Sequence, residues 1–197
     1  MRKGLILLRT LTLRKLWNFS RLYISFQIAR LLRRPIHWGR PAKVGVEPTT
    51  SCNLRCPECP SGLRSFTRPT GMLDLAAFEK MTDSLHRDLI YMPMYFQGEP
   101  YLNPNFLPMA AYAAKKGIYV ATSTNAHYLT EEKARATVES GISRSPLVSI
   151  DGATQATYQQ YRVGGNLEKV KEGTRNLVEW RKSRPSHSLH HPSVPCH

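Results

Sequence analysis

Acidic residues are missing from the first 46 positions of this 197-residue chain, and long uninterrupted apolar runs are missing as well. The first carboxylate is Glu47, whereas eleven Lys or Arg residues precede it. These basic residues interrupt each apolar stretch before it reaches the roughly 20 residues that a transmembrane helix needs. The sequence therefore predicts a basic arm that does not cross a bilayer, and it shows no cleavable secretory signal.

Cysteine is scarce too, with four residues in the chain. Three of them, Cys52, Cys56 and Cys59, form a C-x3-C-x2-C run, and Cys196 is the penultimate residue. A zinc ribbon usually uses two separated ligand pairs, and no second pair is present. Without a secretory signal, a disulfide framework is disfavoured. Three thiolates on one loop suit either zinc or an iron–sulfur cluster with one open iron, and their spacing alone leaves both alternatives open.

The arm differs in composition from the rest of the chain. Of the 28 Lys and Arg residues, 17 lie after position 46, where they are nearly balanced by 14 acids. No proline precedes Pro35, so the arm is expected to be helical. Aromatic residues beside arginines, such as Trp17 and Phe26, suit a helix that lies on an anionic membrane surface through residues 1–40. The alternative is a helix packed over the end of the domain, and a nucleic-acid role is disfavoured because no reader motif is present.

Beyond the arm, strands and helices alternate, which predicts an α/β fold with a parallel sheet. A basic helical arm at 1–42, a core at 43–182 and a disordered Ser/His/Pro tail at 183–197 are expected. The expected strands are Lys43–Glu47, Leu89–Phe96, Ile118–Ser123 and Pro146–Ile150. The expected helices are Asp74–Leu85, Asn105–Lys116, Glu131–Ser140 and Leu167–Lys182, with a short turn at Thr154–Arg162.

Polar motifs follow the expected strands at their carboxyl ends, where active residues lie in parallel α/β folds. They are Gly98-Glu99-Pro100, Thr124-Asn125 and Ser149-Ile150-Asp151-Gly152, with Arg162 further on. Together with the cysteine triplet, these motifs give residues 44–181 a pattern that resembles the radical S-adenosylmethionine (radical SAM) enzymes. The resemblance implies a full or partial (β/α) barrel.

The resemblance also implies the cofactors and the chemistry. Cys52, Cys56 and Cys59 would hold a four-iron four-sulfur (4Fe-4S) cluster, whose open iron would be chelated by S-adenosylmethionine. Reductive cleavage would give methionine and a 5′-deoxyadenosyl radical, which would take a hydrogen atom from a substrate, expected to be a peptide or protein. Such an enzyme needs an electron donor, such as flavodoxin or ferredoxin. It suits the reducing cytoplasm, with the arm at the inner membrane face.

Five further residues are carried over from the resemblance as cofactor contacts. Gly98 and Glu99 would meet the ammonium of the cofactor, since a carboxylate suits a cation and glycine permits close backbone approach. Ser149 and Arg162 would contact the ribose and the carboxylate. Asn125 would order the site. The structural alternatives are an exposed turn for Glu99 and a turn residue for Asn125. For Ser149 the alternative is a strand-end serine, and for Arg162 a surface arginine beside a helix.

Two departures from the family pattern stand out. Many relatives place an aromatic residue just before the third cysteine, near the adenine, whereas this chain has Glu58. The family barrel usually has six βα units, and only four are expected here before the tail. One hypothesis is a truncated or frame-shifted gene product. The alternative functions are therefore an inactive partial barrel that binds a cluster or zinc and serves interactions, or a zinc protein associated with nucleic acid.

Overall fold

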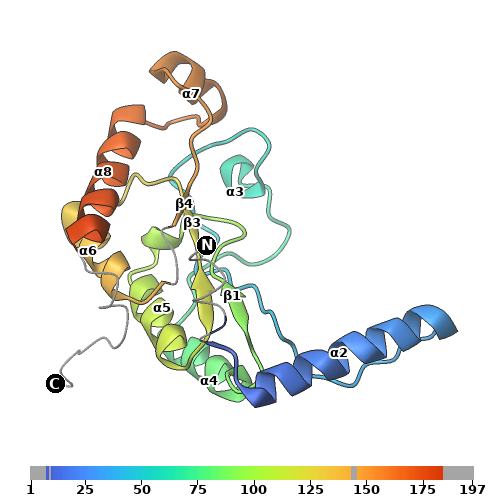
Figure 1. The fold of residues 1–197 in the computed structure, drawn as a ribbon. Coiled ribbons are helices and arrows are strands. Elements are labelled where there is room, and N and C mark those ends of the chain that lie inside the picture. The colour runs from blue at the N-terminus through green and yellow to red at the C-terminus, as the bar shows by residue number, and fades with distance from the viewer. Residues whose placement is uncertain (1–7, 9, 143–145, 184–197) are drawn as a thin grey trace.

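A computed structural model describes residues 8, 10–142 and 146–183, and its ribbon shows helices arranged around short parallel strands (Figure 1). Of the tail predicted at 183–197, residues 184–197 lie outside the described residues, and Ser183 is the last residue of a helix. Helix α2 extends away from the rest of the molecule. The helices are α2 (Leu13–Leu32), α3 (Pro60–Leu63), α4 (Leu75–Leu85), α5 (Phe106–Lys115), α6 (Glu131–Glu139), α7 (Gln155–Tyr161) and α8 (Leu167–Ser183), with a 3-10 turn, η1, at Pro100–Leu102.

The strands pair in parallel and in chain order. β1 (Tyr91–Pro93) pairs with β2 (Tyr119–Ala121), and β3 (Ser123–Thr124) pairs with β4 (Leu147–Val148). Only Thr122 separates β2 from β3, and its hydroxyl donates to the Met94 carbonyl oxygen at 3.1 Å. This order without closure is that of a partial (β/α) barrel, which confirms the predicted fold class.

Several predicted elements differ from those in the structure. Residues 43–47 do not form an assigned strand, although Val44 and Val46 donate backbone hydrogen bonds to the carbonyls of Tyr91 and Pro93. The strand expected at 118–123 is divided at Thr122, because residues 119–121 pair with β1 whereas residues 123–124 pair with β4. The turn expected at 154–162 is helix α7, which begins with a capping box made by two threonines instead of the commoner Thr and Glu.

Local signals set the helix ends. Asp74 accepts from the Ala77 amide at 3.0 Å, and Thr130 accepts from the Lys133 amide at 3.3 Å, as expected of N-cap side chains. Gly117 and Gly141 follow α5 and α6 with positive φ angles of 73° and 75°. These caps confirm the helices that were predicted from them.

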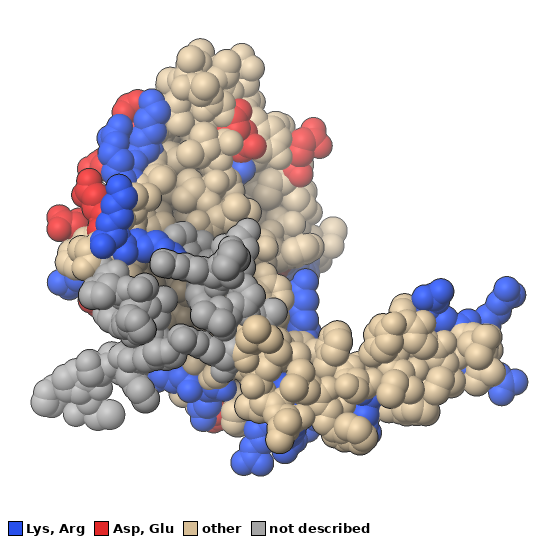
Figure 2. Space-filling view, viewed as in Figure 1, with Lys and Arg blue, Asp and Glu red and all other residues tan. Residues whose placement is uncertain are grey.

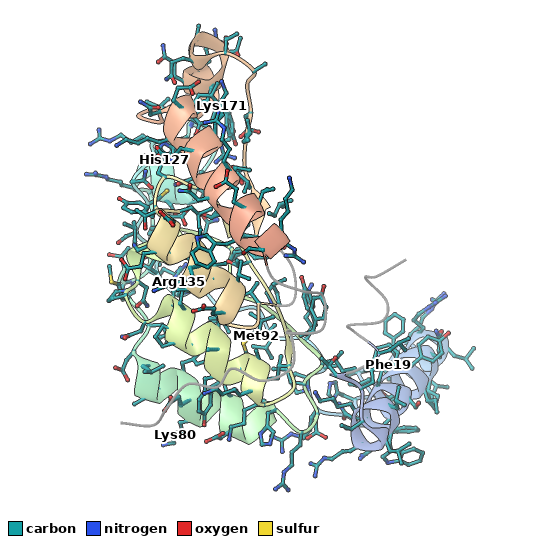
Figure 3. The ribbon with its side chains drawn as sticks, turned by 60° about the vertical axis from the view of Figure 1, so that its left-hand side comes forward. Phe19, Lys80, Met92, His127, Arg135 and Lys171 are labelled. Carbon is teal, nitrogen blue, oxygen red and sulfur yellow. The ribbon has the colours of Figure 1, made fainter. Side chains whose placement is uncertain are left out.

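The core lies where helices α4, α5, α6 and α8 pack on the strands. Met92 of β1, which is labelled in Figure 3, is fully buried, as is Val120 of β2. The helices supply apolar side chains to the same cluster, among them Phe78, Met109, Ala134 and Val170. Continuous apolar burial of this kind is typical of parallel strands that are covered by helices.

Helix α2 attaches to the core through its first turns. Arg14 forms a two-point ion pair with Asp88, at 2.9 and 3.1 Å, and this pairing lowers the pKa of the Asp88 carboxyl. The Lys15 ammonium donates to the Gly117 carbonyl oxygen at 2.6 Å, and Asn18 exchanges two hydrogen bonds with the backbone of Arg40. Within the described ranges, no helix is both long and apolar enough to cross a membrane.

Candidate cofactor site

A cavity of about 150 Å³ lies at the carboxyl ends of the parallel strands. Each of the eight residues that the sequence predicted for the site lines it. They come from five separate segments of the chain: Cys52, Cys56, Cys59, Gly98, Glu99, Asn125, Ser149 and Arg162. Six further residues complete the lining, namely Leu54, Gly62, Tyr95, Phe96, Ser123 and Thr124.

The turn that contains Gly98 fixes the position of the cysteine loop through hydrogen bonds. Pro60 begins helix α3 directly after Cys59, and the Ser61 hydroxyl accepts from the Gly98 amide at 2.9 Å. Gln97 adds a second connection, because its side-chain oxygen lies 3.3 Å from the Ser61 hydroxyl and 3.4 Å from the Cys59 sulfur. The end of β1 therefore positions the third cysteine.

Nitrogen donors surround the other two sulfur atoms. The Leu54 amide lies 3.5 Å from the sulfur of Cys52, and the Asn125 side-chain nitrogen lies 3.9 Å from it. Arg162 reaches the Cys56 sulfur at 3.7 Å. Burial raises the pKa of the Cys52 thiol, although the Leu54 amide opposes this change. Donors around sulfur are the groups that stabilise a metal-bound thiolate.

The three thiols fit an iron–sulfur cluster. They are free and face one cavity, where each could bind a different iron of a cubane. Because each sulfur would bind a different iron of the cluster, the three sulfur atoms do not need to be close enough to bind one and the same metal ion. In the described part of the chain, no three His, Cys, Asp or Glu side chains are placed to hold a single metal ion.

Glu99 connects two strand ends beneath the cavity. Its side chain is buried, and it accepts hydrogen bonds from the Thr124 hydroxyl at 2.7 Å and the Asn125 amide at 2.8 Å. The Tyr101 amide donates a third at 3.3 Å. Burial raises the pKa of Glu99, while the three donors act in the opposite direction. The alternative of an exposed turn residue is therefore wrong, and the contact with the cofactor ammonium stays a prediction.

Replacing Glu99 with glutamine is expected to lower the free energy of unfolding by about 1–3 kcal/mol. Glutamine has one acceptor oxygen, and its amide group would face either the Thr124 hydroxyl or the Asn125 amide. Chemical denaturation of the apo-protein measures the effect. The control is Glu179→Gln on the exposed face of α8, which should change stability by no more than about 0.5 kcal/mol. Equal effects of both changes would contradict the assigned role.

Asn125 joins the end of β3 to the cysteine loop. Its side-chain nitrogen donates to Asn53 at 2.8 Å, and its side-chain oxygen accepts from the His127 amide at 3.1 Å. The His127 ring is used as well, because Nε2 accepts from the Asn166 amide at 2.9 Å while Nδ1 lies 3.0 Å from the Asn125 carbonyl oxygen. Burial lowers the pKa of His127. This histidine, labelled in Figure 3, therefore connects the end of β3 to the segment that precedes α8.

Ser149 and Arg162 close the cavity on the β4 side. The Ser149 hydroxyl lies 3.4 Å from that of Ser123, and the Ser149 amide donates to the Thr124 carbonyl oxygen at 3.0 Å. Arg162 pairs with Asp151 at 2.5 Å. Burial alone would lower the pKa of Arg162, but Asp151 and Cys56 raise it above the usual value. Asp151, to which the sequence assigned only a turn, therefore orients the arginine.

Sequence reasoning gave no role to two aromatic residues at the cavity. Tyr95 and Phe96 follow β1, and the Phe96 side chain is 80% exposed. Glu58, at the position where the family resemblance predicts an aromatic residue, is exposed. The signal that could have identified Phe96 is its place between a buried strand and the Gly98 turn.

Parallel strands in barrel order, a three-cysteine loop and polar strand ends around one cavity define a cofactor site of the iron–sulfur, S-adenosylmethionine type. Residues 46–184 match the family model of the radical SAM superfamily, and the chain belongs to that superfamily. The predicted family is therefore confirmed, as are the 4Fe-4S cluster and S-adenosylmethionine as its characteristic cofactors. The role of each residue stays a prediction.

The curated relatives that this chain matches have several different functions. The AdoMet-dependent heme synthase of Methanosarcina barkeri is 29% identical over 68% of this chain and 38% of its own length. The mycofactocin maturase MftC of Mycobacterium tuberculosis is 29% identical over 67% of this chain and 33% of its own length. The PqqA peptide cyclase of Streptomyces rochei is 32% identical over 61% and 33%. The chain thus spans about a third to two fifths of the length of these relatives.

Solved structures show the same fold. The structure of native anSMEcpe with bound AdoMet superimposes with a TM-score of 0.59 at 19% identity, covering 72% of this chain and 42% of that chain. The same protein with AdoMet and the Kp18Cys peptide gives a TM-score of 0.56 at 20% identity, covering 72% and 41%. At this identity the likeness concerns the fold alone.

Proposed function

We propose that this chain carries the cofactor site of a radical SAM enzyme of the oxidoreductase or maturase type, which acts on a peptide or protein. The observation that carries the proposal is the cavity itself. Three free cysteines and the five polar or glycine residues that the family resemblance predicts as cofactor contacts line one space. A turn residue or a surface arginine would have no reason to meet the cysteines there.

Each residue has a defined task in this proposal. Cys52, Cys56 and Cys59 hold the 4Fe-4S cluster. When bound, the cluster and S-adenosylmethionine supply reductive cleavage of a carbon–sulfur bond and removal of a hydrogen atom from the substrate, with electrons from a donor such as flavodoxin or ferredoxin. Arg162, held by Asp151, offers a planar cation to the cofactor carboxylate.

The remaining contacts define the shape of the cofactor site. Gly98 brings its backbone close to the cysteine loop, and Glu99 fixes that turn against β3. Asn125 orders the loop through Asn53. Phe96 offers an exposed aromatic face for the adenine in place of the missing aromatic residue at Glu58.

The substrate class is supported by relatives rather than by the cavity. The name of the Streptomyces rochei relative specifies a peptide, and one structure with the same fold holds a peptide beside AdoMet. The name of another relative, an AdoMet-dependent heme synthase, specifies no peptide. A peptide substrate is therefore part of the proposal and is tested separately from cofactor cleavage.

Anaerobic reconstitution with iron and sulfide tests the proposal. The protein should bind about four iron atoms, absorb near 400 nm and, after reduction with dithionite, convert S-adenosylmethionine to 5′-deoxyadenosine and methionine. Cys56→Ala should lose product by at least about 100-fold. The matched control is Cys196→Ala, which removes the cysteine outside the triplet and should retain iron and product.

The outcomes separate the alternatives. A full cluster without 5′-deoxyadenosine would support the inactive, cluster-binding alternative. One zinc ion per chain and no visible absorption would overturn the assignment of the cysteine loop. Equal loss in the Cys56 and Cys196 variants would contradict a ligand set made of the triplet alone.

A further inference from the structure

Helix α2 has its polar and apolar residues in the reverse of the usual arrangement. Its buried residues are Lys15, Asn18 and Ser25. Its exposed residues include most of its large apolar side chains, with exposures from 46% to 87%. A helix of a globular protein normally turns its apolar stripe to the core. The exposed set is Leu13, Leu16, Trp17, Phe19, Tyr23, Ile24, Phe26, Leu31 and Leu32.

These apolar side chains form two outward stripes. Trp17, Ile24 and Leu31 follow one another at seven-residue intervals, which places them along one side of the helix. Phe19 and Phe26 are also seven residues apart and make a second stripe. Figure 3 shows the side chains of this helix, Phe19 among them, clear of the main body. So wide an exposed apolar surface marks an interaction site.

Charge decides between the possible occupants. The arm carries eleven Lys or Arg residues before Glu47, and Figure 2 shows blue atoms along this projection without red ones. Arg21 and Arg30 lie exposed among the aromatic residues. A second copy would bring the same excess of positive charge to the contact. An anionic lipid surface supplies both an apolar layer and negative charge.

The attachment of α2 fixes how the domain would face that surface. Asp88, Gly117 and Arg40 hold the helix, and they lie two to four residues before β1, β2 and Val44, which pairs with β1. The helix therefore sits at the amino ends of the strands. The cofactor cavity lies at their carboxyl ends, on the opposite side.

We propose that α2, with the exposed Trp38 beside it, lies on an anionic membrane surface and holds the cofactor cavity on the side turned away from the lipid. The contacts that attach α2 to the core are an ion pair and hydrogen bonds of polar side chains. The apolar stripes therefore remain exposed to solvent. The inference is independent of the proposed chemistry, since it uses none of the cavity residues.

Vesicle co-sedimentation of the full chain tests the lipid contact. Binding is expected to vesicles that contain phosphatidylglycerol and to be at least about tenfold weaker with pure phosphatidylcholine. Trp17→Gln/Phe19→Gln/Phe26→Gln and, separately, Arg21→Gln/Arg30→Gln should each reduce binding on the order of tenfold or more. The matched control, Lys80→Gln/Lys169→Gln, removes two exposed charges outside the arm and should bind normally. Circular dichroism verifies that the variants fold.

Tryptophan quenching by brominated lipid chains tests the orientation. The chain has three tryptophans, so Trp38→Phe/Trp180→Phe leaves Trp17 as the reporter, which should be strongly quenched. A second variant, Trp17→Phe/Trp38→Phe/Trp180→Phe with Gln160→Trp, reports from α7 on the cavity side and should not be quenched.

Three results would overturn the inference. The first is unchanged vesicle binding by the apolar triple variant, and the second is equal quenching from both reporters. The third is a self-associated protein that becomes monomeric in the arm variants while neither form binds vesicles. The last result would assign the apolar stripes to a second copy of the chain.

Discussion

Replacing Gly62 with alanine is expected to remove the iron–sulfur cluster almost completely. Gly62 is buried in α3, and a Cβ atom there would lie 2.4 Å from the Cys56 carbonyl oxygen and 2.5 Å from the Cys56 amide nitrogen. Both atoms belong to the backbone, so a side-chain rotation cannot relieve the overlap. The loop must move, and Cys56 and Cys59 move with it. Iron content after reconstitution should fall at least about tenfold, because metal geometry tolerates shifts of only tenths of an ångström.

Gly71→Ala is the matched control for this change. Gly71 lies between the same loop and α4, and an added Cβ would have no neighbour within 4 Å. Iron content and absorption near 400 nm should remain those of the unchanged protein. Full iron content in the Gly62 variant would show that the loop can adapt and that its close packing is not needed for cluster binding.

Replacing Gly98 with alanine is expected to destabilise the domain itself, by about 3–5 kcal/mol. The residue has a φ of +76°, where an L-residue is strained, and a Cβ would lie 2.2 Å from the Thr49 carbonyl oxygen. A second backbone oxygen, that of Ser51, would lie at 2.8 Å. Such a loss is a large part of the stability of a typical domain. The measurement is urea denaturation of the apo-protein, followed by circular dichroism.

Gly45→Ala provides the comparison, since the nearest atom to its Cβ would be a side-chain carbon of Pro93 at 3.9 Å. This change should alter the free energy of unfolding by less than about 1 kcal/mol. The apo-protein is used so that loss of the cluster does not contribute. A Gly98 variant as stable as the Gly45 variant would mean that the turn can rearrange without cost.

The sequence predicted the parts of the site that depend on chain order. Parallel strands place their carboxyl ends at one edge, so residues that follow successive strands meet there. The alternation of strands and helices therefore predicts that Glu99, Asn125 and Ser149 lie at one edge, while their assignment as cofactor contacts came from the family resemblance. The N-caps at Asp74 and Thr130 could be predicted because the side chain of an N-cap residue accepts a hydrogen bond from an amide only three residues further along the chain.

Other features depend on contacts between distant residues, which the sequence does not specify. The exposed-turn alternative for Glu99 could be judged only when the Thr124 hydroxyl and the Asn125 amide were seen beside it. Asp151 gained a role from Arg162, eleven residues away across α7. The inverted burial of α2 was equally hidden, because the apolar pattern shows which residues prefer burial and not which side meets the core.

The contacts that close the cysteine loop come from far along the chain, and this sets an order during synthesis. Asn125 lies 72 residues beyond its partner Asn53, and Arg162 lies 106 residues beyond Cys56. Val163 supplies the carbonyl that accepts from the Arg55 amide at 2.9 Å. The three cysteines are therefore synthesised long before the residues that enclose them. The loop stays open to iron and sulfide, and equally to oxygen, until the segment beyond α7 has emerged and folded back.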